Sequence, residues 1–264
     1  MKLTIVGASG SMSGPEGPAS SYLVQVNGSD EDGVPRIWSV VFDLGPGAFG
    51  ALWNYVNPRE LDAVVFTHGH ADHMGDSVSM YVHNRWNPSG CMERLNVYGP
   101  AQTRDRIKQI DGSATDEELE TVFDFHAVVA REAFVVGPLR ITPYPALHPV
   151  ETYGYRIEAS RGFDSATMAF TGDTDMCPAI VEMADGVDLL LSEAAFTTAD
   201  TLRGMHLDGV RAGQLAADAQ VGQLVITHVQ PWTDKDLVAE EVRTTWNGPL
   251  GMAAPGQVYS IGDA

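Results

Sequence analysis

The chain contains few cysteines and no long hydrophobic run. Only Cys91 and Cys177 are cysteines among 264 residues, and they do not form a C-x-x-C pair. Two such residues cannot build a disulfide framework, so we expect both to be reduced. No apolar stretch approaches the ~20 residues that span a membrane, and the first residues become glycine-rich too early for a signal peptide. These absences predict a cytoplasmic protein that does not enter a membrane.

Basic residues are also scarce. The chain carries 16 Lys and Arg against 35 Asp and Glu, which gives a formal net charge of −19. Long nucleic acids are bound mainly through Lys and Arg, so the charge argues against such a partner. A small anion held by metal ions is compatible with it. The acidity has a second explanation, since it also keeps a protein soluble.

The pattern of apolar residues indicates one α/β domain over residues 1–264. The hydrophobic content of 44% can supply a large core. Short apolar runs predict strands, and the segments between several of them have helical character, which is typical of a layered α/β fold. The strands are expected at residues 3–6, 22–26, 37–42, 63–66, 95–98, 139–143, 153–157, 167–170, 189–191 and 224–226. The helices are expected at residues 47–56, 72–86, 101–110, 116–129, 208–219 and 234–246, with Asp208 and Asp234 as caps.

A dense cluster of potential metal ligands follows one predicted strand. His68-Gly69-His70-Ala71-Asp72-His73 comes directly after the apolar run 63–66. Neutral imidazoles and carboxylates bind zinc or iron at neutral pH, and the carboxyl end of a strand is a common place for a catalytic site. A polar turn that happens to be rich in histidine is the structural alternative. The density and placement favour a metal site.

Further polar side chains follow other predicted strands. His148, Asp173 and His228 each come shortly after an apolar run. A single histidine at a strand end is more often satisfied by hydrogen bonds than by a metal. Several histidines and carboxylates at the ends of different strands instead favour a metal site. His83 and His126 fall within predicted helices, where we expect packed or surface histidines, and Cys177 is expected to be a small buried side chain.

Together these motifs resemble the metallo-β-lactamase superfamily. The match includes Phe42-Asp43-Leu44-Gly45, the cluster at residues 68–73, His148, Thr171-Gly172-Asp173-Thr174 and His228, in that order. The resemblance implies a four-layer αβ/βα sandwich of two mixed sheets, with the site along one edge. It implies that His68, His70 and His148 hold one metal ion, that Asp72, His73 and His228 hold the second, and that Asp173 bridges them. Asp43 would orient ligands, or would be an ordinary turn residue.

The run 189–196 with His206 resembles the ribonuclease Z-like phosphodiesterases of that superfamily. In them a glutamate and a histidine are paired outside the metal shell, which makes Glu193 and His206 candidates for catalysis together with Asp72. His206 would be the general acid, because a nearby carboxylate favours its protonated form. A surface histidine and a satisfied strand-end carboxylate are the alternatives. Glyoxalase-type thioesterases share the histidine cluster but not this pair.

The predicted substrate is a small phosphodiester. Only 24 residues separate His148 from Asp173, which leaves no room for the long arm with which the resembling tRNA-processing ribonucleases hold tRNA. The stretches 3–15, 19–24 and 42–48 resemble actinobacterial cyclic-nucleotide-degrading phosphodiesterases. The resemblance implies hydrolysis of 3′,5′-cyclic AMP to 5′-AMP by metal-bound hydroxide. A tRNA 3′-end endoribonuclease and a metal-binding scaffold without catalysis are the alternatives.

Two divalent metal ions are the expected cofactors. Zinc is the first expectation, and iron or manganese suit the same ligands. Relatives are often dimers, so the resemblance also implies a homodimer. The loop 7–20, rich in Gly, Ser and Pro, is expected to be irregular, and the sequence leaves open whether it borders the active site or only connects two strands.

Overall fold

Two mixed sheets form the centre of the molecule. The computed structural model describes residues 1–90, 93–161 and 164–262, and within them each sheet has seven strands, in the orders β14-β1-β2-β3-β4-β5-β6 and β13-β12-β11-β10-β9-β8-β7. The first sheet consists of β1 (Lys2–Gly7), β2 (Ser21–Ser29), β3 (Pro35–Phe42), β4 (Ala63–Val65), β5 (Leu95–Gly99), β6 (Phe123–Ala127) and β14 (Val258–Ser260). The second consists of β7 (Phe134–Val136), β8 (Leu139–Pro145), β9 (Tyr153–Arg161), β10 (Asp164–Phe170), β11 (Leu189–Glu193), β12 (Gln223–Thr227) and β13 (Leu250–Met252).

Each sheet is antiparallel on one side and parallel on the other. In the first sheet β14, β1, β2 and β3 pair antiparallel, and β3 to β6 pair parallel. In the second, β7 to β10 pair antiparallel, and β10 to β13 pair parallel. The parallel strands β4, β11 and most of β12 are buried along their length, as expected for strands covered on both faces.

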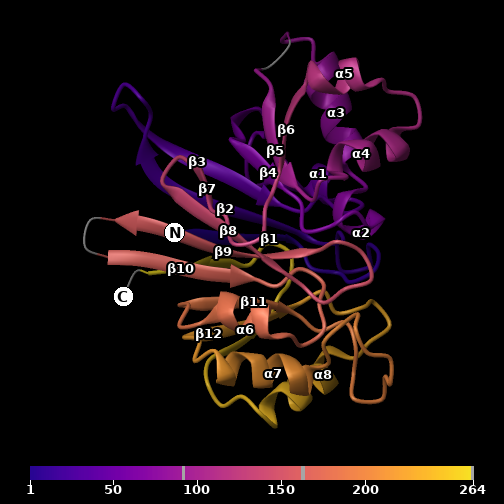
Figure 1. The fold of residues 1–264 in the computed structure, drawn as a ribbon, viewed down its shortest axis with the longest axis vertical. Coiled ribbons are helices and arrows are strands. Elements are labelled where there is room, and N and C mark those ends of the chain that lie inside the picture. The colour runs from indigo at the N-terminus through magenta and orange to yellow at the C-terminus, as the bar shows by residue number, and fades with distance from the viewer. Residues whose placement is uncertain (91–92, 162–163, 263–264) are drawn as a thin grey trace.

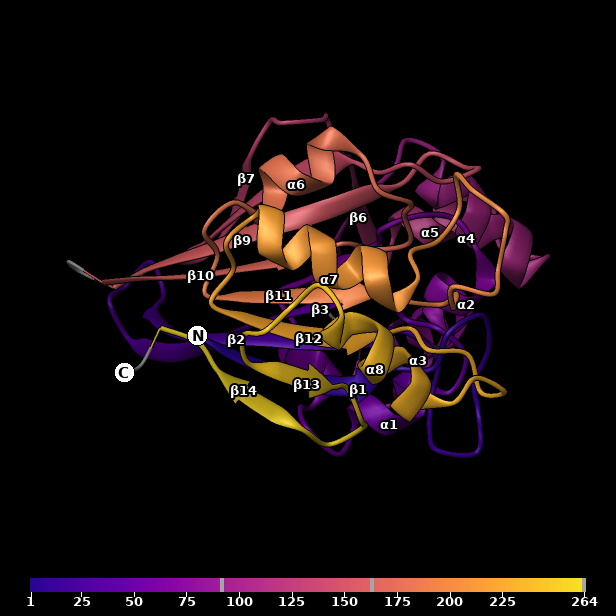
Figure 2. The ribbon, with the colours of Figure 1, turned by 90° about the horizontal axis from the view of Figure 1, so that it is seen from below.

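Helices cover the outer face of each sheet. Figures 1 and 2 show α1 to α5 beside the first sheet and α6 to α8 beside the second. The helices are α1 (Ala48–Leu52), α2 (Ala71–Met74), α3 (Ser77–Trp86), α4 (Thr103–Asp111), α5 (Asp116–Glu120), α6 (Pro178–Ala184), α7 (Gly209–Asp218) and α8 (Lys235–Arg243), with a 3₁₀ turn at Pro58–Glu60.

Three apolar clusters fill the spaces between the four layers. The central one contains buried side chains from both sheets, including Tyr22 and Tyr155. A second joins the first sheet to its helices through residues such as Phe66 and Met74, and a third joins the second sheet to α6, α7 and α8. The predicted four-layer αβ/βα sandwich is therefore confirmed.

Ten expected strands are present, but the helix expected at residues 116–129 is wrong. A capping box between Thr115 and Glu118 starts α5, which ends at Glu120. The chain then forms β6, which pairs with β5. Its residues 123–127 alternate apolar and polar side chains, a pattern that suits an edge strand with one covered face. His126 therefore lies on a strand, not on a helix as expected.

The other predicted helices differ less from the structure. The helix expected at residues 72–86 is broken at Gly75 and Asp76 into α2 and α3, and the one expected at residues 47–56 is shortened to α1. Asp208 and Asp234 cap α7 and α8 as expected, because each side chain accepts a hydrogen bond from a first-turn N–H group. The strands β7, β13 and β14, of three residues each, were not expected. Across the described ranges, the helices are too short or too polar to cross a bilayer.

Candidate metal centre

The candidate site lies where strands of both sheets end. Asp43 follows β3, and His68 follows β4, in the first sheet. In the second sheet His148 follows β8, Asp173 follows β10 and His228 follows β12. All seven expected metal ligands meet in two neighbouring groups, although they come from four segments that lie far apart in the sequence. This edge is the usual location of a site in sheets with parallel strands.

The first group consists of His68, His70 and His148, whose ring nitrogens face one another. His70 Nδ1 lies 3.0 Å from His68 Nε2 and 3.1 Å from His148 Nε2. In His68 and His148 the second ring nitrogen has its own partner. His68 Nδ1 lies 3.0 Å from Thr67 Oγ1, and His148 Nδ1 lies 2.9 Å from the carbonyl oxygen of Met205. Burial lowers the pKa of all three histidines, which keeps them neutral with lone pairs free to coordinate an ion.

The second group consists of Asp72, His73, Asp173 and His228. His73 Nε2 lies 3.1 Å from Asp173 Oδ1 and 3.2 Å from His228 Nε2. His228 Nε2 lies 3.2 Å from Asp72 Oδ2. Asp72 and His73 come from the short helix α2, which presents both toward the end of β12. Two imidazoles and two carboxylates therefore surround one small volume.

A third carboxylate lies behind the second group. Asp43 Oδ2 is 2.7 Å from His73 Nδ1, and the same side chain accepts hydrogen bonds from the N–H and hydroxyl groups of Thr67. Burial lowers the pKa of His73, but Asp173, Asp43 and Asp72 together raise it well above its usual range. This excess of buried negative charge favours a cation in the second group. Asp43 thus contacts a candidate ligand directly, as the ligand-orienting role would require, and also lies in the turn after β3.

Asp173 lies between the two groups. Its Oδ1 faces His73 and His228, at 3.1 and 3.5 Å, and its Oδ2 faces His68 Nε2 at 3.9 Å. Within the described ranges, the buried Oδ1 has no hydrogen bond of good geometry, and neither has His228 Nδ1. Buried polar atoms are rarely left without a partner. Imidazole and carboxylate side chains whose nitrogen and oxygen atoms face one volume fit divalent ions such as zinc, iron or manganese.

His206 stands beside both groups and is paired with Glu193. The distance from His206 Nδ1 to Glu193 Oε1 is 2.9 Å, and both side chains are buried. Burial alone would lower the pKa of His206, but the Glu193 carboxylate raises it to about 9. Glu193 also accepts hydrogen bonds from two backbone N–H groups, so its oxygens are already occupied. The centroid of the His206 ring lies 5.4 Å from that of His148 and 5.7 Å from that of His228.

The glycine-rich loop 7–20 borders the site. The N–H of Ser11 points at His228 Nε2, 3.3 Å away, and that of Gly10 donates to the carbonyl of Val229. A side chain at Gly10 would collide with the carbonyl oxygen of His228, because its Cβ would lie 2.1 Å away. Glycine is therefore required for this close approach.

Several other site residues were not predicted from the sequence. Thr67 bridges Asp43 and His68, and its only signal was its place directly before the histidine cluster. The carbonyl of Met205 has no sequence signal, because any residue carries one. Conversely, His83 packs between the rings of Phe49 and Trp53, away from the metal groups.

The remaining predicted bystanders also lie outside the metal groups. His126 stacks on Tyr98 at the edge of the first sheet. Cys177 is half-buried rather than fully buried as expected, with its Sγ 3.9 Å from the carbonyl of Pro145. Cys91 lies outside the described residues.

Comparison with known proteins identifies the family. The model of the beta-lactamase superfamily domain matches residues 39–229, so the chain belongs to that superfamily. A protein of Mycobacterium tuberculosis whose name states no function is 33% identical over 264 residues, which cover 99% of this chain and 92% of the relative. The "probable metallo-hydrolase" YhfI of Bacillus subtilis is 26% identical, over 98% and 99% of the two chains. Ribonuclease BN of Escherichia coli is 28% identical, over 87% and 89%.

Solved structures show the same relationship. The crystal structure of YhfI has a TM-score of 0.83 and covers 98% of each chain. The short form of human tRNase Z has a TM-score of 0.75 at 18% identity, over 99% of each chain. The likeness to tRNase Z shows the fold alone, while the sequence relatives YhfI and ribonuclease BN support the ribonuclease Z-like branch of metal-dependent hydrolases. The family, branch and enzyme class expected from the sequence are confirmed.

Proposed function

We propose that the protein is a binuclear-metal phosphodiesterase that hydrolyses small cyclic nucleotides, with 3′,5′-cyclic AMP as the leading substrate and 5′-AMP as its product. The observation that carries the proposal is the buried His206–Glu193 pair, 2.9 Å apart, beside two groups of metal ligands. This combination supplies a proton donor next to a centre suited to binding phosphate oxygens. Cleavage of a phosphodiester with an alkoxide leaving group needs both functions.

The two ligand groups have separate roles in the proposal. His68, His70 and His148 would hold one ion, while Asp72, His73 and His228 would hold the other, with Asp173 between them. When bound, two divalent ions would activate a water molecule and neutralise charge on the phosphate. Zinc is the first candidate for both positions. Asp72 would also contact the reacting water, which accounts for its expected place among the catalytic residues.

His206 would deliver the proton to the leaving group. Its Nδ1 is engaged by Glu193, so Nε2–H is the free donor. At neutral pH the raised pKa keeps the ring protonated, which a general acid requires before it can donate. Glu193 would hold the ring in position and stabilise its positive charge. A 3′-oxygen departing from phosphorus would take the proton from Nε2.

A small substrate fits the fold better than tRNA. The interval between His148 and Asp173 is occupied mostly by the paired strands β9 and β10, not by an extended arm. The net charge of −19 also opposes a long polyanion. The similarity to ribonuclease BN favours the ribonuclease alternative. Cleavage of a precursor tRNA at physiological salt would establish that alternative.

The test is an assay of metal-loaded protein on 3′,5′- and 2′,3′-cyclic nucleotides, with an aryl phosphodiester as a general substrate. We expect turnover of the 3′,5′-cyclic form. Hydrolysis of the aryl ester alone would overturn the cyclic-nucleotide assignment but retain the phosphodiesterase. Metal content near zero in protein purified without chelator, with no turnover of any ester, would favour a scaffold without catalysis.

A further inference from the structure

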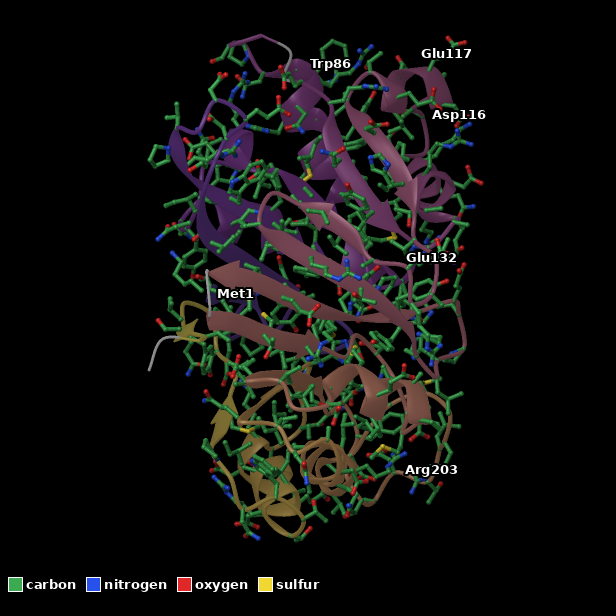
Figure 3. The ribbon with its side chains drawn as sticks, turned by 60° about the vertical axis from the view of Figure 1, so that its left-hand side comes forward. Met1, Trp86, Asp116, Glu117, Glu132 and Arg203 are labelled. Atoms are coloured by element: carbon green, nitrogen blue, oxygen red, sulfur yellow. The ribbon has the colours of Figure 1, made fainter. Side chains whose placement is uncertain are left out.

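The segment that carries His206 is a long surface connection. Residues 194–208 run between β11 and α7 without a helix or strand, and Thr201, Leu202 and Arg203 are exposed. Figure 3 shows Arg203 at the surface of the C-terminal half of the molecule. His206 comes three residues later and is buried. A proton donor at the end of such a connection needs fixed anchors, because a displacement of about 1 Å can cost a hundredfold in rate.

Asp175 anchors the connection to the metal-binding segments. Its buried carboxylate accepts hydrogen bonds from the N–H groups of Gly204 and Met176, each at 2.6 Å. Its own N–H donates to the carbonyl of Leu147 at 2.8 Å, directly before His148. Asp175 thus joins the connection to the segments that present Asp173 and His148.

Arg211, in the first turn of α7, completes the anchor. Its Nη2 donates to the carbonyl of His206 at 2.9 Å, and its Nε donates to Asp208 Oδ2 at 2.9 Å. Its Nη1 forms an ion pair with Asp175 Oδ1. The exposed fraction of the Arg211 side chain is 19%, and that of the Asp175 side chain is 7%. One guanidinium therefore holds the backbone of His206, the cap of α7 and the segment after Asp173 together.

We infer that Arg211, paired with Asp175, is a positioning residue that fixes His206 for proton transfer. The inference rests on the proposed function, in which His206 is the general acid. A guanidinium has a planar set of donors that can serve three acceptors at once, which no other side chain reproduces. Without it, the carbonyl of His206 loses its partner, and the backbone that carries the ring can shift, so that the ring stays bonded to Glu193 but changes its position relative to the leaving oxygen. The candidate ligands keep their contacts with one another, while His148 also touches the connection through the carbonyl of Met205, so metal content is measured alongside turnover.

The test compares substrates that differ in their need for a proton donor. Bis(p-nitrophenyl) phosphate releases a stable phenolate, whereas 3′,5′-cyclic AMP releases an alkoxide that must be protonated. We expect Arg211→Gln to lower kcat on 3′,5′-cyclic AMP by roughly 10- to 100-fold, a part of the 10²–10⁴-fold effect of a general acid. Its kcat on the aryl ester should fall less than about threefold, and KM and metal content should stay near those of the wild type. Arg211→Lys should recover only part of the loss.

Two further variants separate positioning from stability. Gln214→Ala, an exposed change on the same helix, is the matched control and should leave both activities unchanged. The double variant Asp175→Asn with Arg211→Gln removes both charges, so it should unfold at a higher temperature than Arg211→Gln yet keep the loss on 3′,5′-cyclic AMP. Equal losses on the two esters, loss of metal, or full recovery in the double variant would overturn the inference. A wild type that hydrolyses the aryl ester but no cyclic nucleotide would instead overturn the proposed substrate, and the comparison would then use a dialkyl phosphodiester, whose leaving group is an alkoxide.

Discussion

At the scale of single residues, the proposed function divides the histidines of the site into metal ligands and a proton donor, and two substitutions test this division. His148→Ala removes a nitrogen of the first group, so metal content should fall. His206→Ala should retain both ions and lose about 10²–10⁴-fold in turnover of a cyclic nucleotide. Elemental analysis of both variants, alongside the assay, measures the two effects separately. Equal metal loss in the two proteins would contradict the division.

Asp43 offers a second test at this scale. It accepts from Thr67 and lies 2.7 Å from His73 Nδ1, and its backbone has a φ of 58°, in the left-handed region. Asp43→Asn should weaken metal binding roughly 10- to 100-fold, because the carboxylate fixes the orientation and basicity of His73. A competition titration with a chromophoric chelator measures the affinity. Asp62→Asn is the control, since Asp62 directly precedes β4 and accepts from the N–H of Ser39 without contacting the site. An unchanged affinity in Asp43→Asn would assign Asp43 to the turn alone.

Sequence patterns indicated all seven candidate ligands and Asp43 behind them, but not the other supporting contacts. Residues such as His68 and Asp173 are visible in the sequence because metal chemistry restricts the residue type at a strand end. The supporting contacts are different, because the carbonyl of Met205 and the guanidinium of Arg211 act through positions that only the fold brings together. Nothing in the local sequence marks such contacts.

At the scale of elements, Gly45 determines how closely the turn after β3 approaches α2. A Cβ at Gly45 would lie 2.0 Å from the carbonyl oxygen of Asp72, within the helix that carries two of the candidate ligands. Gly45→Ala should therefore destabilise the fold by roughly 1–3 kcal/mol and weaken metal binding. Gly50, in α1, has nothing within 4 Å of its Cβ position, so Gly50→Ala should be neutral or stabilise by roughly 0.4–1 kcal/mol. Denaturant unfolding of both variants measures the difference. Similar values for the two would show that α2 shifts without cost.

The elements also show which patterns predict structure well. Buried strands such as β11 and β12 each contain a run of three apolar residues, so their positions are predicted within two residues. The sequence predicts a helix where the edge strand β6 forms, because these residues follow closely on a capped helical turn. Edge strands have one partner and one covered face, which leaves a weaker pattern in the sequence.

At the scale of the whole molecule, the two candidate metal positions would join the halves of the sandwich. The first-sheet half contributes His68, His70, Asp72 and His73, and the second-sheet half contributes His148, Asp173 and His228. Each ion that binds this arrangement only in the folded state stabilises it by mass action, by about 2.7 kcal/mol at a free metal concentration of 100 times Kd. Removing both ions with a chelator should lower Tm by roughly 10–20 °C, given about 2–4 °C per kcal/mol for a chain near this size. Readdition of zinc or manganese should restore Tm, and His206→Ala should show the same metal-dependent shift as the wild type. A Tm that stays constant while elemental analysis shows that the ions have left would mean that the halves hold together without them, through the apolar cluster between the sheets alone.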